Sequence, residues 1–556
     1  MLLSETLGRY GMTKCSTVYK VISCAVLLSA AVHAIPAFPG AEGGGAGSVG
    51  GRGGRVIEVT NCNDTGEGSL REACGAQGRR TVVFRTGGII ATRSAIHITH
   101  PYLTIAGQTA PGGGITLHGL ESSRQPLSAA THDIIIRCIR VRTGRGDQSG
   151  QGGDAIALTS NCNRIIIDHC SVSWSNDENV SMWADNGVSQ NVTFSWNIIS
   201  EGLNFDHPGC GLIVGSNVNS TDMENISVVK NLFAHNYNRN PLLKCSNGHI
   251  INNIIYNWEW WATGIAGGIT IDIIGNVYKK GSDSGNRSEI IHRPNTSGDA
   301  ATGPAGNPSI YLKNNIGPHN SDPDADNWNT MLEQSSPSHW GWPGSPPTRT
   351  RVPRSCERSE SIPAGDYPIH RYDVGELDSI LLAEVGARYR LDENGNKVMN
   401  RDTIDKRVIR EYLDGTGTCP TDENEVGGFA TIDPGTPYDD ADHDGMPDAW
   451  ENTHGFDPSS EADRNDDPDS DGYTNLEEFL NGTNPGNDPT AVSQAVLPPT
   501  KVMTHSSGGR RQGVLYNLDG SRRCHESSLN SFQVPVGVYI MVSGERRVCF
   551  ERIFGR

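Results

Sequence analysis

Seven short apolar segments between residues 134 and 317 share one pattern, in which a strand-like run is followed by a small or polar residue at a fixed place. They read IIIRCIRVR, IIIDHCSVSW, VTFSWNIIS, SVVKNLFAHN, IINNIIYNW, IDIIGNVYK and YLKNNIG. Aligning them places these residues at one register: Cys138, Cys170, Asn197, Asn231, Asn253, Asn276 and Asn315. The steps between them are 32, 27, 34, 22, 23 and 39 residues, which suggests a base unit of 22–23 with loop insertions.

A repeat of this kind is typical of a solenoid, in which each unit buries its inward face only by stacking on its neighbours. We therefore predict an all-β protein built as a right-handed parallel β-helix, with the recurring Asn side chains forming an internal hydrogen-bonded ladder. The alternative is a β-sandwich with Asn in its turns. A constant local motif at irregular spacing favours the solenoid. The low aromatic content of 6% and the 66 glycines also disfavour a helical bundle.

Charge is concentrated in one part of the chain. Residues 421–490 contain 20 Asp and Glu but only one basic residue, Arg464, so this segment carries −19 of the total −18 and the remainder about +1. An acidic segment on a nearly neutral body indicates a cation site, and no basic stripe with interleaved aromatics suggests a nucleic-acid partner. No apolar run reaches 18 residues, so we predict no transmembrane segment.

Residues 1–34 have the pattern of an export signal. Lys14 and Lys20 precede the apolar stretch VISCAVLLSAAV, and Val-His-Ala at 32–34 resembles a cleavage site. We predict a mature start near Ile35 and a secreted or cell-surface protein. Cys62 and Cys74 are close in sequence and are candidates for a disulfide in an oxidising compartment.

Six segments in order resemble secreted pectate lyases of polysaccharide lyase family one. They are FPGAEGGGAG (Phe38–Gly47), GGRGG (Gly50–Gly54), VTNCNDTGEGSLREAC (Val59–Cys74), LTIAGQTAPGGGITL (Leu103–Leu117), IIIDHCSVSWSNDENVS (Ile165–Ser181) and NLFAHNYNRNPLLK (Asn231–Lys244). The resemblance covers roughly residues 35–321, with a weaker signal to about 420. It implies calcium-dependent eliminative cleavage of polygalacturonate, giving 4,5-unsaturated oligogalacturonates, with Ca²⁺ acting as a Lewis acid.

The resemblance also assigns roles to individual residues. Arg239 falls on the family's proposed base, and Lys244 falls where a second cation binds substrate carboxylate. A lysine that assists catalysis in the family is missing near residues 207–215, and His207 is a candidate substitute.

The calcium ligands carry over less completely. Asp154 and Asp177 match acidic positions of the family, but the second of two acids spaced i, i+4 falls on Ser181, and Glu178 is the candidate replacement. Asp168 and His169 match a pair that we interpret as structural.

Two twelve-residue loops in the acidic segment fit the calcium-loop pattern, with acids at positions 1, 3 and 5, Gly at 6 and Glu at 12. The predicted ligands are Asp440, Asp442, Asp444, Asp448 and Glu451 in the first loop, and Asp467, Asp469, Asp471 and Glu478 in the second. They resemble EF-hand-like or thrombospondin type-three repeats, and short helices, PDAWENT and NLEEFLN, follow the loops. We expect a calcium-ordered spacer.

We divide the chain into a signal peptide (1–34), a β-helix domain with long C-terminal loops (35–420), a calcium-binding module (421–490), and a linker with a small C-terminal β domain (491–556). Within the loops, 374–385 has a helical period. Residues 515–523 and 534–553 resemble the C-terminal sorting domain of type nine secretion cargo, which implies secretion machinery as a partner. We expect a monomer.

Two other functions are compatible with a β-helix. A polygalacturonase-type hydrolase would use paired carboxylates without metal, and Asp177-Glu178 is the only adjacent candidate pair in the β-helix. A non-catalytic polysaccharide-binding β-helix would explain Ser181 and the missing lysine as lost activity.

Overall fold

The computed structural model describes residues 35–120, 125–145, 153–205, 207–218, 220–340, 350–363 and 365–486, and four strands nearer the C-terminus. The predicted signal peptide and most of segment 491–556 lie outside the described residues. Among the helices that are described, none is long and apolar enough to cross a membrane.

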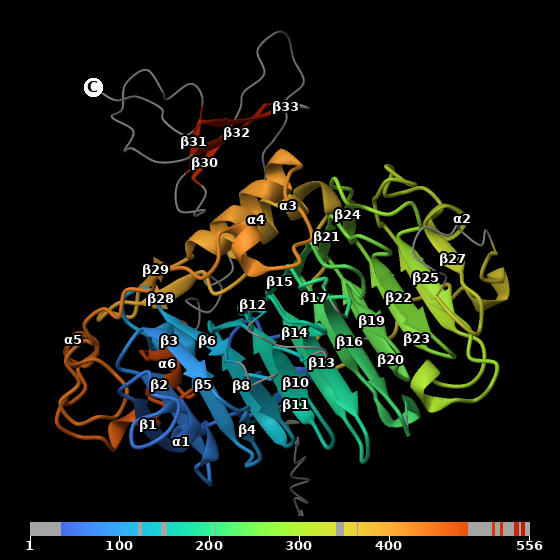
Figure 1. Ribbon diagram of the computed structural model, residues 1–556. Helices are drawn as coiled ribbons and strands as arrows, with labels where there is room; N and C mark the ends of the chain where they lie inside the picture. The colour runs from blue at the N-terminus through green and yellow to red at the C-terminus, as the bar shows by residue number, and fades with distance from the viewer. Residues whose placement is uncertain are drawn as a thin grey trace, which may run out of the picture. The chain divides into compact units, whose positions relative to one another are not determined.

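Three parallel sheets form the body of the protein (Figure 1), and neighbouring strands in them are three apart in chain order, except for the pairs β1–β2 and β25–β27 at the ends of two sheets. The ten-stranded sheet has the order β1 (Arg55–Val59), β2 (Arg80–Phe84), β5 (Leu103–Ala106), β8 (His132–Arg137), β11 (Asn163–Asp168), β14 (Gln190–Ser195), β17 (Ile226–Val229), β20 (Asn247–Ile251), β23 (Thr270–Ile274) and β26 (Ser309–Lys313). Each coil therefore adds one strand to each sheet, which is the architecture of a parallel β-helix.

The other two sheets follow the same rule. The nine-stranded sheet has the order β27 (Leu332–Gln334), β25 (Ile290–Arg293), β22 (Thr263–Ala266), β19 (Leu242–Leu243), β16 (Cys210–Ser216), β13 (Glu178–Ala184), β10 (Ile156–Leu158), β7 (Leu127–Ala129) and β4 (Ile96–Ile98). The eight-stranded sheet has the order β24 (Val277–Lys279), β21 (Ile254–Tyr256), β18 (Leu232–Ala234), β15 (Ile198–Ser200), β12 (Ser171–Ser173), β9 (Arg140–Arg142), β6 (Ile115–Gly119) and β3 (Gly88–Thr92). The predicted fold is confirmed.

The predicted Asn ladder is present inside the solenoid. Asn253 Nδ2 donates to Asn276 Oδ1 at 3.0 Å, while Asn253 Oδ1 accepts from Asn231 Nδ2 at 3.0 Å. The chain of amides runs from Asn197 through Asn315 and continues to Asn327 in α2 (Asn327–Met331), which the repeat did not reveal. Stacked amides satisfy one another, so each coil can bury polar side chains without cost from unpaired groups.

One position of the alignment is wrong. Strand pairing sets Arg137 opposite Asp168, so Cys138 faces His169 and Ile139 occupies the ladder register beside Cys170. Backbone conformation agrees, because Cys138 and His169 both have positive φ, at 57° and 50°. Cys138 therefore occupies the turn position that comes directly before the ladder position of its coil, as His169 does in the next coil.

The glycine-rich segment near residue 44 lies against the ten-stranded sheet. Gly44 N donates to Ser227 Oγ at 3.1 Å, and Gly45 N donates to Thr193 Oγ1 at 2.9 Å. A Cβ at either glycine would lie 2.0 Å from a backbone oxygen, of Asn225 or of Ile165. The backbone reaches the sheet this closely only because these residues have no side chain.

Helices lie outside the sheets: α1 (Leu70–Gly75), α2, α3 (Val374–Glu384), α4 (Thr403–Asp414), α5 (Asp448–His454) and α6 (Asn475–Asn481). The predicted helix at 374–385 is confirmed as α3, but the long loops expected around it also contain α4. Asp402 caps α4 by accepting from Asp405 N, and Gly415 ends it in the left-handed conformation. Together α3 and α4 bury apolar side chains against Ile198, Leu232 and Ile254 of the eight-stranded sheet.

The nine described cysteines are free thiols, so the candidate pair Cys62 and Cys74 is not joined by a disulfide. The Cys62 thiol donates to Gly87 O at 3.5 Å, whereas Cys74, in α1, is buried in the core of the β-helix. Burial raises the pKa of the Cys74 thiol to about 12, which keeps it unreactive.

Short strands and helices complete the C-terminal half. β28 (Tyr389–Leu391) and β29 (Lys397–Met399) form an antiparallel pair, and α5 and α6 begin at or near the ends of the two predicted calcium loops, as expected. The four described C-terminal strands, β30 (Val514–Asn517), β31 (Arg523–His525), β32 (Tyr539–Ser543) and β33 (Arg546–Phe550), form an antiparallel sheet of their own.

Candidate active site

Most of the predicted site residues gather at the N-terminal ends of four neighbouring strands of the nine-stranded sheet. Asp154 precedes β10, Asp177 and Glu178 stand at the start of β13, His207 precedes β16, and Arg239 precedes β19. Because β10, β13, β16 and β19 are consecutive neighbours in the sheet, residues far apart in the sequence meet here. The parallel register thus assembles the site from four coils.

Three carboxylates converge at this edge. Asp154, Asp177 and Glu178 each offer an oxygen, and these oxygens lie within 4.8 Å of one another. Pairing of Ile156 with Val180 sets Asp154 beside Glu178, whose amide donates to Asp154 Oδ1 at 3.3 Å. Asp154 and Glu178 are thereby held rigidly on neighbouring strands.

Ser181 stands where the family has an acid, and its role here is to support Asp154. Its Oγ donates to Asp154 Oδ2 at 2.5 Å. Burial raises the pKa of Asp154 to about 7, and the charge of Asp177 adds to the increase, while the hydrogen bond from Ser181 and the charge of Arg239 oppose it. Because Ser181 carries no carboxylate, the third carboxylate of the cluster comes from Glu178.

Arg239 reaches this cluster from the next coil but one. Its Nη1 forms an ion pair with Glu178 Oε1 and lies 3.5 Å from Asp177 Oδ1. The backbone of Arg239 has a φ of 58°, and its carbonyl accepts from Leu212 N at 2.6 Å. Burial lowers the pKa of Arg239, against the opposing charges of Asp177 and Asp154. The side chain keeps 26% of its surface exposed, so it faces the pocket.

His207 lies at the rim of the same cluster. Its Nδ1 is 3.2 Å from Asp177 Oδ1, and 43% of its side chain is exposed. The predicted substitute for the missing lysine is thus within reach of the carboxylates, on the side open to solvent.

Lys244 lies at the opposite end of β19 from Arg239. Its Nζ donates to Ala301 O at 3.1 Å and lies 5.0 Å from the ring centroid of Trp183. Burial, together with the charges of Arg239 and Arg293, lowers the pKa of Lys244 to about 7, while the charge of Asp299 opposes this change. Two cationic side chains therefore lie on either side of β19, with Arg239 beside the carboxylates and Lys244 at the other end of the strand.

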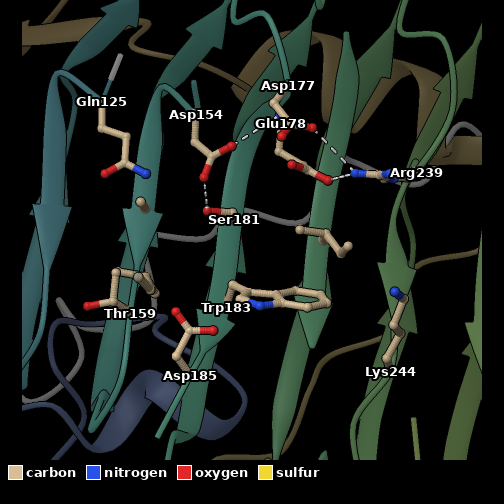
Figure 2. Close-up of a pocket in the computed structure, with 13 residues that line it drawn as sticks. Gln125, Asp154, Thr159, Asp177, Glu178, Ser181, Trp183, Asp185, Arg239 and Lys244 are labelled. Carbon is tan, nitrogen blue, oxygen red and sulfur yellow. Dashed lines mark hydrogen bonds and ion pairs between the residues drawn. The ribbon is translucent and has the colours of Figure 1, made fainter. Parts of the chain in front are cut away.

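A pocket of about 450 Å³ joins these groups (Figure 2). In Figure 2 the carboxylates and Arg239 lie at one end and Lys244, Trp183 and Asp185 at the other. The sequence did not reveal Gln125, Trp183 or Asp185 as lining residues. Trp183 lies beside Gly215 on the paired strand, where a Cβ would come within 2.6 Å of its ring, so this glycine makes room for the indole. The pocket is an elongated site with charged groups at both ends.

No protein-family model matches the chain. The chain is 35% identical over 436 residues to the probable pectate lyase C of Aspergillus flavus, a match that covers 77% of this chain and 90% of that protein. It is 36% identical over 435 residues to the probable pectate lyase C of Emericella nidulans, which covers 77% and 88%. The chain belongs to the pectate lyase family. Among solved structures, jun a 1, the major allergen from cedar pollen, matches 62% of this chain and 92% of its own with 18% identity and a TM-score of 0.44.

The Asp168–His169 pair of this pectate lyase family member is structural, as expected. Asp168 is buried and accepts from Arg137 Nε at 3.1 Å and from Ser195 Oγ at 2.8 Å, and it pairs with His169 at 2.6 Å. Although burial opposes ionisation, His169 and Arg137 bring the pKa of Asp168 down to about 2. The pair fixes three neighbouring coils and lies in the ten-stranded sheet, away from the pocket.

The carboxylate cluster fits a divalent cation. Asp177 Oδ1 and Glu178 Oε1 are buried and accept no hydrogen bond from any described residue; ion pairs to Arg239 balance them. Convergent carboxylate oxygens are the donors that Ca²⁺ prefers. Asp154, Asp177 and Glu178 therefore fit the ion that pectate lyase family membership leads one to expect.

The two predicted calcium loops differ in how their acids are placed. In the first, oxygens of Asp440, Asp442 and Asp444 lie within 4.8 Å of one another, and in the second those of Asp467, Asp469 and Asp471 do so. Glu451 joins Asp444 in a further cluster. Asp448 lies outside these clusters, because its Oδ1 accepts from Ala441 N at 2.8 Å. Glu478 is buried, and its Oε2 accepts no hydrogen bond within the described chain.

Proposed function

We propose that this member of the pectate lyase family cleaves (1→4)-α-D-galacturonan by β-elimination and releases 4,5-unsaturated oligogalacturonates. The observation that carries the proposal is the Arg239 guanidinium held against Asp177 and Glu178 in an elongated pocket, with Lys244 further along the same strand line. A polyanionic chain needs a cationic group along its path, and elimination needs a base beside C5.

The reaction removes the proton on C5, α to the uronate carboxylate, and breaks the bond between C4 and the glycosidic oxygen, leaving a C4–C5 double bond. The departing oxygen takes a proton from water and becomes the hydroxyl of the other fragment. Asp154, Asp177 and Glu178 would hold Ca²⁺, which when bound offsets the charge of the substrate carboxylate and so makes the C5 proton more acidic.

Arg239 takes the C5 proton in this proposal. A guanidinium is ordinarily protonated at every accessible pH, so the protein must favour its neutral form. Burial lowers the pKa of Arg239, and Asp177 and Asp154 oppose that change. These carboxylates are also the proposed ligands of the cation. With a cation bound, their negative charge would be balanced, and they would stabilise the protonated form of Arg239 less.

Substrate binding falls to groups around the reacting centre. Lys244 would pair with a uronate carboxylate, and Trp183 beside it offers an aromatic face to a sugar ring. His207, at the exposed rim next to Asp177, is placed for a second contact with the substrate. The binding path would then run from the carboxylates toward Lys244.

The direct test incubates the full chain with polygalacturonate in calcium or in chelator, and measures both ultraviolet absorbance of unsaturated product and reducing ends. We expect both signals with calcium and neither with chelator. Reducing ends without unsaturation would mean hydrolysis, with Asp177 and Glu178, both ion-paired with Arg239, as the candidate carboxylates. Retained binding of the polymer with neither signal would leave a non-catalytic binding protein.

Further proposals concern the parts outside the β-helix. The loops at 440–451 and 467–478 would bind calcium, as their pattern of acids indicates. Residues 1–34 would direct export and residues 491–556 would be recognised by type nine secretion machinery, placing the protein at the cell surface or in the medium. We expect it to act as a monomer.

A further inference from the structure

An acid outside both loop patterns reaches the first loop. Asp463, in the single 3-10 turn Asp463–Asn465 between the loops, offers an oxygen that lies within 4.8 Å of oxygens from Asp444 and Glu451. Its other oxygen, Oδ2, accepts from Asp457 N at 3.1 Å. The backbone thus fixes the carboxylate with one oxygen turned toward the loop.

Several carboxylate oxygens around this point are buried and have no hydrogen-bond partner among the described residues. Glu451 and Asp444 are both fully buried, and neither oxygen of Glu451 accepts a hydrogen bond from a described residue. Asp444 belongs both to this cluster and to that of Asp440 and Asp442, and five oxygens of the two clusters are buried without a hydrogen-bond partner in the described chain: Asp442 Oδ2, Asp444 Oδ2, Glu451 Oε1, Glu451 Oε2 and Asp463 Oδ1. Buried carboxylates in this number favour a bound cation, because an ionised carboxylate without a partner is unfavourable inside the protein.

The geometry points to a divalent-cation site in which Asp463 completes the first loop, and which fastens the calcium module to the first coils of the β-helix. This inference rests on the calcium loops proposed above and goes beyond their twelve-residue pattern. Asp463 supplies an oxygen from outside the loop, while Asp448, at position 9, is engaged with the loop backbone. The all-oxygen donor set suits Ca²⁺.

The same loop is tied to the β-helix. Asp440 Oδ2 lies 3.3 Å from Nη1 of Arg85, which follows β2, and Arg85 Nη2 donates to Tyr438 O at 2.7 Å. Near the second loop, Glu477 accepts from Arg52 Nε with both oxygens at 2.8 Å. A cation at the first loop therefore shares its ligand Asp440 with an arginine of the solenoid.

Apolar packing extends this contact. Met446 and Trp450, which precede Glu451 in the first loop, pack in one cluster with Phe479 of α6 and with Ala106 and Cys138 of the β-helix. The cation would fix the positions of Met446 and Trp450 in this cluster. Calcium at the first loop should thus order β1 and β2 as well as the module.

The second loop lacks an equivalent. Its unpartnered buried oxygens among described residues are Asp467 Oδ1, Asn475 Oδ1 and Glu478 Oε2, of which the amide oxygen of Asn475 is uncharged, and no outside acid joins the cluster of Asp467, Asp469 and Asp471. The first loop should therefore bind calcium more tightly than the second, since affinity rises with the number of charged ligands.

The test compares Asp463→Asn with Asp466→Asn in the full chain. Asp466 is exposed, lies three residues away and loses the same charge. Calorimetric titration of chelator-stripped protein with Ca²⁺ should show the tightest site weakened about tenfold or more in Asp463→Asn, and within about twofold of wild type in Asp466→Asn. Hydrogen exchange in calcium should show faster exchange of β1 and β2 amides only in Asp463→Asn.

Thermal unfolding in chelator separates loss of the cation from loss of the fold. Without calcium, Asp463→Asn should unfold no earlier than wild type, because asparagine keeps the bond from Asp457 N and removes repulsion. Equal isotherms for the two variants would overturn the assignment of Asp463, and a weakened site with unchanged exchange of β1 and β2 would overturn the fastening role. Neither readout depends on lyase activity, so failure of the proposed reaction would be seen separately.

Discussion

At the scale of single residues, the site is a balance between one guanidinium and three carboxylates. Arg239 pairs with Glu178 and lies near Asp177, while Ser181 holds Asp154 by a hydrogen bond. The serine therefore has a defined task despite the departure from the family pattern. Glu178, on the same strand, contributes the third carboxylate of the cluster with Asp154 and Asp177.

Lys244 gives a prediction for pH. Its pKa of about 7 means that it is charged below that pH and becomes neutral above it. The KM for polygalacturonate should therefore rise several-fold between about pH 6 and about pH 9, as the ammonium that pairs with substrate carboxylate is lost. Initial rates across substrate concentrations at each pH measure this. In Lys244→Arg, which stays charged, the rise should disappear; an unchanged rise in that variant would show that another group is responsible.

The motifs identified Arg239 and three carboxylates because these residues sit in contiguous, family-like sequence. They did not identify Trp183, Gln125 or Asp463. Gln125 and Asp463 reach their sites from another coil or turn, and which coil faces which depends on loop lengths and on strand register. Trp183 lies on β13 with Glu178, but beyond the end of the matching motif at Ser181. Asp463 lies outside the twelve-residue pattern, so only its distance to Asp444 and Glu451 reveals it.

At the scale of elements, the ladder of amides links successive coils. Asn253 is fully buried, donates to Val228 O at 2.8 Å and to Asn276 Oδ1 at 3.0 Å, and accepts from the backbone and side chain of Asn231. Register in a parallel solenoid is fixed by such internal groups, since a slip by one residue would turn every apolar side chain outward.

Asn253→Ala should lower the free energy of unfolding by about 2–4 kcal/mol, because it leaves buried partners on two neighbouring coils without their bonds. Denaturant unfolding followed by circular dichroism measures the change. The exposed Asn286, which accepts from Lys280 Nζ at 2.8 Å, provides the control, and Asn286→Ala should cost less than about 0.5 kcal/mol. Equal losses in the two variants would contradict the role of the ladder.

Periodicity sufficed to predict the solenoid and the ladder, since both repeat with the coil. It failed at Cys138, where a cysteine one residue early resembled Cys170, and backbone φ rather than residue type marks the register. It also missed α4, whose apolar face is visible only against the eight-stranded sheet that it covers.

At the scale of the whole molecule, charge is divided between two parts. Residues 421–490 carry −19 and the rest of the chain about +1, and α5 and α6 of the acidic segment pack against the nearly neutral body. Without a cation the carboxylates of the module repel one another at short range. The stability of the protein should therefore respond to salt in a way that depends on calcium.

In chelator, raising NaCl from low ionic strength to about 0.5 M, where the Debye length falls to roughly 4 Å, should raise the Tm by several degrees. In calcium the same change in salt should have a smaller effect, because the repulsion is already neutralised. Differential scanning calorimetry at matched protein concentration measures both. An equal response with and without calcium would contradict the assignment of the loops as cation sites.

The proposed chemistry depends most on Arg239. The direct measurement is the initial rate of unsaturated product formation from polygalacturonate in saturating calcium, for wild type, Arg239→Lys and Arg239→Ala, with polymer binding measured on the same samples. We predict that both variants bind the polymer and that both lose at least about a hundredfold in kcat, as expected for removal of a positioned base. Arg239→Ala retaining a rate within about tenfold of wild type would contradict proton removal by this residue.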